Sequence, residues 1–288
     1  MMPDVWGLAA IVTKFALYLG VLTAAGTVMA ALAFRLERTR GLAMTFAALG
    51  LVAAILTFSL RGANLTGDAS GMIDPEMLGL LWSTPVGTAL MYRLTGLGLL
   101  IAGLLVGSIL KGRIGLWISA FGGIMAIWSF GHVGHVSGRD STLLDIALLL
   151  HLLAVALWIG ILTPLKRLAS ASETYATAAD VGHRFGIIAM VTVPALVVAG
   201  GYMGYALVGS FAALFSSGYG QALIIKVVLV TSLLGLAAAN KLRFIPKLRS
   251  DDPIAAYHLT KSITLEWCII ITILAVTAVL TSNLTLPT

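Results

Sequence analysis

The chain has 288 residues, of which 59% are hydrophobic and 10% are charged, and its formal net charge is +6. A soluble domain carries about 25% charged residues, so this composition excludes a protein whose whole surface faces water. The single cysteine, Cys268, excludes an intrachain disulfide and any metal site built on a pair of cysteines.

Apolar stretches of about 20 residues, the length that crosses the hydrocarbon core of a bilayer, recur along the whole sequence. The predicted fold class is therefore all-α, a polytopic helical membrane protein in which residues 1–288 form a single transmembrane domain. We predict eight membrane-spanning helices, over residues 14–34, 42–60, 87–110, 114–131, 142–164, 184–208, 220–240 and 262–281.

The connections between the predicted spans differ in charge, and this difference predicts the orientation. The connections on one side of the membrane, after the second, fourth and sixth spans, hold few basic residues beyond Arg61 and Arg139. The connections on the other side, after the first, third, fifth and seventh spans, hold Arg35, Arg38, Arg40, Lys111, Arg113, Lys166, Arg167, Arg184, Lys241, Arg243, Lys247, Arg249 and Lys261. By the positive-inside rule the basic side is cytoplasmic. Both termini are then periplasmic, and we expect a multi-pass protein of the bacterial inner membrane.

Residues 61–86 form the longest connection on the expected periplasmic side. This loop contains Met72 and Met77, and its run Asp74-Pro75-Glu76 puts a proline at a first helical position. Proline is favoured at that position, and an aspartate before it is a helix-start signal. The sequence therefore predicts a short interfacial helix over 75–82.

Several charged side chains fall inside the predicted spans. Lys14, Arg93 and Lys226 lie near outer ends, where snorkelling to the interface is the favoured interpretation. Glu266 lies near the cytoplasmic end of the last span, where we expect Lys261 or Lys241 to neutralise it as a structural pair.

Histidines concentrate between residues 130 and 160. His132 and His135 are three residues apart at the end of the fourth span, so they share one face if the helix continues. Following that face inward leads to Trp128 and then to Met125. His132 and His135 lie at the expected outer mouth of the bundle.

His151 lies deeper, about 14 Å below the start of the fifth span at 1.5 Å per residue. Ala147, Ala154 and Trp158 share its face, and small residues on a face favour a helix–helix contact over lipid. A polar group at that depth needs a partner, because no water is there to hydrogen-bond it.

Imidazole binds copper, zinc, iron and nickel, whereas the methionine thioether selects soft Cu(I). The chain has ten methionines, and the candidate metal ligands are His132, His135, His151, Met125, Met72 and Met77. The pattern alone leaves three interpretations open: metal or haem ligation, a hydrogen-bonded structural set, and a proton relay.

Several strings, in this order, carry a resemblance to a known family. They are "STPVGTALMYRLTGLGLL" at 83–100, "GHVGHVSG" at 131–138, "HLLAVALWIGILTPL" at 151–165, "YGQALIIKVVLV" at 219–230, "AANKLRFIPKL" at 238–248 and "SITLEWCIIITILAVTAVLTSNL" at 262–284. Over about residues 60–285 the sequence resembles the copper resistance protein D (CopD/PcoD) family of bacterial inner-membrane proteins.

The resemblance implies copper handling together with a small periplasmic copper-binding protein of the CopC type. Some relatives carry that module fused to the chain, and this sequence does not, so we expect a separate CopC-like partner. The resemblance also implies that metal contacts fall on His132, His135, His151 and Trp158.

The expected function is copper transport into the cell, contributing to copper homeostasis and resistance. In this hypothesis Met72 and Met77 receive Cu(I) or Cu(II), His132 and His135 bind it at the mouth, and His151 passes it inward. The alternatives are a haem b electron-transfer protein, with His132 or His135 and His151 as axial ligands, and a structural or assembly subunit.

No enzyme is expected, because no Ser/His/Asp spacing, phosphate-cradling glycine loop or HExxH motif occurs. The expected partners are membrane lipids and a second copy of the chain, with no role for nucleic acid.

Overall fold

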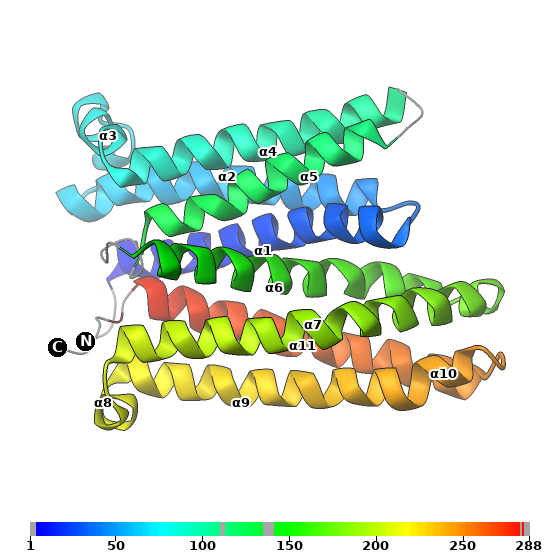
Figure 1. Ribbon diagram of the computed structural model, residues 1–288. Coiled ribbons are helices and arrows are strands. Elements are labelled where there is room, and N and C mark those ends of the chain that lie inside the picture. The colour runs from blue at the N-terminus through cyan, green and yellow to red at the C-terminus, as the bar shows by residue number, and fades with distance from the viewer. Residues whose placement is uncertain (1–3, 110–112, 135–140, 283, 285–288) are drawn as a thin grey trace.

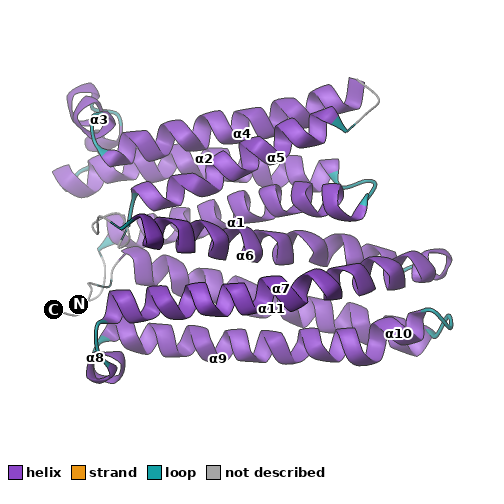
Figure 2. Cartoon of the chain, in the orientation of Figure 1, coloured by secondary structure: helices purple, strands orange, loops and turns teal. Residues whose placement is uncertain are grey.

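The chain folds into a bundle of long helices that run side by side (Figure 1). This computed structural model describes residues 4–109, 113–134, 141–282 and 284, and no strand occurs among them (Figure 2). Eight helices in this part of the chain are long and apolar enough to cross a membrane, which confirms the predicted fold class. They are built on α1 (Val5–Phe34), α2 (Arg40–Thr66), α4 (Pro85–Ile109), α5 (Ile114–Trp128, which a 3-10 turn extends to His132), α6 (Thr142–Leu168), α7 (Tyr175–Val208), α9 (Gly218–Ala239) and α11 (Pro253–Ser282).

Shorter helical segments connect the spans. They are the 3-10 helices η1 (Ala69–Met72), η2 (Ser129–His132) and η3 (Ser172–Thr174), the π-helix η4 (Asn240–Phe244), and the α-helices α3 (Pro75–Trp82), α8 (Phe211–Ser216) and α10 (Ile245–Leu248). The range of α3 is the range over which the sequence predicts a short helix, and Asp74 caps it by accepting from the backbone N–H of Glu76 at 2.9 Å.

The two ends of the bundle hold different segments, which give them their names. The α3 end holds α3, α8, the start of α1 and the end of α11 (Figure 1). The basic end holds the connections α1–α2, α4–α5, α6–α7 and α9–α11. Lys111, His135 and Arg139 lie outside the described residues.

Several helices are longer than predicted. α1 begins at Val5 instead of 14, α2 ends at Thr66 instead of 60, and α11 begins at Pro253 instead of 262. An apolar stretch marks only the part of a helix inside hydrocarbon, whereas capping groups fix where the helix ends. Asp4 accepts from the backbone N–H of Gly7 at 2.7 Å, and Gly67 ends α2 with a φ of 75°.

α1 forms the centre of the bundle. It contacts α2 and α5 in one half of the molecule and α6 and α11 in the other. The apolar window of α1 is 72% buried, against 11% for α7 and 6% for α9. α7 and α9 therefore lie at the periphery of the bundle.

Close approach of α1 and α6 depends on glycine. A Cβ at Gly26 would lie 1.7 Å from the carbonyl oxygen of Ala156, and one at Gly160 would lie 2.0 Å from the carbonyl carbon of Gly26. Small residues permit such backbone contact, which drives helix association in membranes.

Arginines at the basic end satisfy helix carbonyls. Arg113 donates to Leu32 and Arg184 donates to Ala33, both at the end of α1, and Arg40 donates to Gly107 near the end of α4. The last carbonyls of a helix lack intrahelical donors. These arginines therefore also hold the ends of neighbouring helices together.

Candidate functional site

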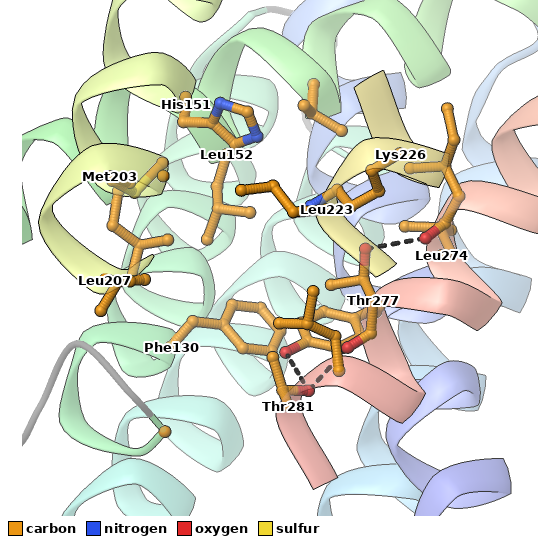
Figure 3. A pocket seen from close by; sticks show the side chains of 18 of the residues that line it. Phe130, His151, Leu152, Met203, Leu207, Leu223, Lys226, Leu274, Thr277 and Thr281 are labelled. Carbon is orange, nitrogen blue, oxygen red and sulfur yellow. Dashed lines mark hydrogen bonds between the residues drawn. The ribbon is translucent and has the colours of Figure 1, made fainter. Parts of the chain in front are cut away.

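A cavity of about 1400 Å³ opens between the core and the peripheral helices. Its lining residues come from α1, α2, α4, α6, α7, α9 and α11, mainly from the halves of these spans nearest the α3 end. Most of the wall is apolar, and histidine, methionine and cationic side chains interrupt it (Figure 3).

His151 reaches into this cavity from α6 (Figure 3). Its ring lies against Gly200 of α7, where an added Cβ would be 3.4 Å from Cε1 and 3.5 Å from Nδ1. Nδ1 is buried and has no hydrogen-bond partner among the described residues, although the backbone of Leu196 lies beside the ring. His151 therefore has a buried imidazole nitrogen that no described residue satisfies.

Met203 lines the same cavity from α7 (Figure 3). It is one turn after Gly200, so its thioether lies on the face of α7 that meets the His151 ring. Met203 is absent from the candidate ligands predicted from sequence. In the sequence the available signal is a spacing: Met203 follows Gly200 by three residues, so the two share one face of their helix.

His132 lies beside this cavity but is not part of its wall, although Phe130 and Val133 line it. It ends η2, and its ring centroid is 4.9 Å from that of Tyr92 and 6.2 Å from that of Trp128. Its Nδ1 is also buried without a partner in the described part of the chain. His132 is not among the residues that line the cavity, so the structure does not bring it together with His151 there.

The predicted methionine ligands also lie outside the cavity wall. Met72 ends η1 and Met77 lies on α3, both partly buried at the α3 end, and Met125 is partly buried on α5. Among the described residues no group of three or more His, Cys, Asp or Glu side chains is arranged to hold a metal. The roles of Met72, Met77 and Met125 stay predictions.

Four cationic side chains line the cavity, from four different helices. They are Lys14 on α1, Arg61 on α2, Arg93 on α4 and Lys226 on α9, and no described Asp or Glu lines it with them. Figure 3 shows Lys226 reaching from α9 into the space that His151 enters from α6.

Snorkelling, the sequence interpretation of these cations, is wrong for Arg93. Arg93 is only 5% exposed, its Nε donates to Ser129 Oγ at 3.0 Å, and its guanidinium lies 5.3 Å from the ring centroid of Phe130. Lys14 lies in the third turn of α1 because that helix starts at Val5, and its Nζ donates to the carbonyl of Thr281 at 2.8 Å. Both side chains therefore point into the protein.

Glu266 lies behind the cavity wall. It is 2% exposed, and its carboxylate accepts from Trp158 Nε1 at 3.1 Å and from Asn240 Nδ2 at 2.5 Å. The prediction that Lys241 or Lys261 neutralises it is wrong: Lys241 donates to the carbonyl of Gly186 and Lys261 to the hydroxyl of Tyr257. Trp158 lines the cavity, so one indole connects the cavity wall to a buried carboxyl group.

Two family models match the chain. Residues 2–145, half of the chain, match "Copper resistance protein D-like, N-terminal domain", and residues 179–280 match "Copper resistance protein D". His132 falls in the first matched region and Met203, Lys226 and Glu266 in the second, whereas His151 lies between the two. No curated protein and no solved structure gives a significant match.

Proposed function

The chain belongs to the copper resistance protein D family, and we propose that it moves copper across the bacterial inner membrane from the α3 end toward the basic end. Membership in this family gives the chain a role in copper resistance. The proposal of copper movement rests on one observation: His151 and Met203 enter one cavity from neighbouring helices.

The donor set suits a soft copper ion that must be released again. Thioether sulfur selects Cu(I), and imidazole nitrogen also binds it. A transported ion must bind strongly enough to enter and weakly enough to leave, which a two-ligand site achieves better than a closed four-ligand structural site. We therefore assign the central step to His151 and Met203 and the cargo to Cu(I).

The proposed direction rests on charge. The positive-inside rule puts the basic end in the cytoplasm, so α3 and its loop face the periplasm. In this orientation Met72 and Met77 would meet a CopC-like donor first, and His132 would bind the copper next. His135, the other ligand predicted there, lies outside the described residues.

Copper uptake by cells or proteoliposomes tests the proposal. We expect His151→Ala and Met203→Leu to reduce uptake strongly, because each removes one of two ligands. Met190→Leu is the matched control, since Met190 is on the same helix but 58% exposed and outside the cavity lining. Unchanged uptake in both His151→Ala and Met203→Leu would exclude this route.

Haem b is the second candidate, because the cavity is large and its cations suit the two propionates of a haem. A bis-histidine haem needs two imidazoles facing one space, and of the histidines that the structure describes only His151 lines the cavity. The optical spectrum of the purified protein decides: a Soret band supports haem, and a colourless preparation that binds Cu(I) supports copper.

A further inference from the structure

Lys14, Arg61 and Arg93 form a cationic cluster at the cavity's α3 end, and the chain supplies no described counter-ion for it. The three charges lie close enough to influence one another electrostatically. Within the described residues the one ion pair is Arg184–Asp180, on α7 at the other end of the bundle. We propose that an acidic membrane lipid binds in this cavity, with its phosphate among Lys14, Arg61 and Arg93.

The energetic argument starts from burial. Like charges repel most strongly where the dielectric constant is low, and a buried charge without a partner is costly in a membrane protein. Arg93 is 5% exposed, and its one hydrogen bond to a described residue uses Nε. Its guanidinium fork is a geometry that binds phosphate in a bidentate manner.

The depth of the cluster matches that of a lipid headgroup. α1 has 30 residues and is about 45 Å long, whereas the hydrocarbon core is about 30 Å thick. Lys14 and Arg93 lie in the third turns of α1 and α4, and Arg61 lies in the last two turns of α2. All three therefore lie within about two helical turns of the boundary between headgroups and hydrocarbon.

The opposite wall of the cavity explains why the anion should carry an apolar tail. Val197 and Tyr205 on α7 and Val227 and Val228 on α9 line the cavity, and they are 51%, 74%, 58% and 59% exposed. The cavity therefore opens sideways between α7 and α9, toward the hydrocarbon of the bilayer. An acyl chain can lie in this opening while the phosphate contacts the cations.

A bound lipid would also ease the passage of copper, a consequence that rests on the proposed function. Four cations repel a metal ion that approaches His151. A bound phosphate neutralises part of this charge, so the lipid would make the route passable for Cu(I). The lipid site itself does not depend on copper.

The test uses the copper-free full chain and native mass spectrometry after reconstitution into nanodiscs of equal phosphatidylcholine and phosphatidylglycerol. We expect the protein to retain phosphatidylglycerol in preference to phosphatidylcholine. Arg61→Gln should reduce this retention about tenfold, because it removes a charge-assisted contact. Arg61 is exposed and donates no hydrogen bond to a described residue, so its replacement should leave the fold intact.

Arg167→Gln is the matched control, since Arg167 is also exposed but lies at the basic end; it should retain the lipid like the wild type. Equal retention of the two lipids, or equal loss in both variants, would overturn the proposal. Displacement of the lipid by millimolar inorganic phosphate would show a soluble anion instead. A Soret band would show that haem propionates occupy the cluster. Because copper is absent throughout, these outcomes are independent of the uptake assay.

Discussion

At the scale of the residue, the most unusual group is the carboxyl of Glu266. It lies within a membrane span and contacts two neutral donors, Trp158 and Asn240, with no cation beside it in the described structure. Asn240 also begins the π-helix η4, and π-helical turns occur often at functional sites. The hydrogen bonds to Glu266 therefore join α6, η4 and α11 at one point.

The two replacements Glu266→Gln and Glu266→Leu separate hydrogen bonding from charge. Glutamine keeps an acceptor for Trp158, and its amide can donate to Asn240 Oδ1, which has no partner among the described residues. Leucine leaves both donors unpaired, at a cost of about 1–3 kcal/mol. We expect thermal unfolding in detergent to show a lower midpoint for Glu266→Leu and a nearly unchanged one for Glu266→Gln; equal losses would mean that the negative charge matters instead.

Sequence reasoning identified His151 correctly as a deep polar group on a helix–helix face, but it assigned its partners from proximity in sequence. His132 and Met125 are near in sequence, yet His132 faces Tyr92 and Trp128 instead of the cavity. Met203 and Lys226 come from α7 and α9. Which side chains meet across a bundle depends on the rotation of each helix, and short polar motifs do not determine that rotation.

At the scale of the element, glycine decides how closely helices pack. Gly26 of α1 and Gly160 of α6 lie backbone to backbone, whereas a Cβ at Gly98 of α4 would meet nothing within 4 Å. The two kinds of glycine look alike in sequence, and only the packing distinguishes them.

Gly26→Ala should therefore destabilise the bundle, because the added methyl group would meet the Ala156 carbonyl and force α1 and α6 apart. Overpacking of this kind costs about 1–3 kcal/mol. Gly98→Ala should be neutral or stabilising by up to about 1 kcal/mol, since alanine has the higher helix propensity. The yield and unfolding midpoint of the purified variants check this, and a loss in Gly98→Ala matching that in Gly26→Ala would contradict it.

The number and order of the spans could be predicted because each needs about 20 apolar residues. Their ends could not, because Asp4, Gly67 and the start of α11 lie outside the apolar stretches. The cavity was also beyond prediction, since it arises where α7 and α9 stand away from α1.

At the scale of the whole molecule, the cationic side chains form two groups. Arginines at the basic end bind helix carbonyls, and cations near the α3 end surround a cavity. The first group predicts orientation by the positive-inside rule. Of the second group only Arg61 is exposed, and it is the member that the rule counts on the side opposite the basic end.

Reporter fusions test the orientation. Alkaline phosphatase, which is active only in the periplasm, should be active when inserted after Asp68 and inactive when inserted after Asp251 in the connection before α11. The opposite pattern would place α3 in the cytoplasm and reverse the proposed direction of copper.

The central claim is that Cu(I) binds between the imidazole of His151 and the thioether of Met203. X-ray absorption spectroscopy of the copper-loaded protein tests it most directly. The account predicts nitrogen and sulfur neighbours around copper, with the sulfur lost in Met203→Leu and retained in Met190→Leu. A copper environment without sulfur, or one that Met203→Leu and His151→Ala both leave unchanged, would contradict it.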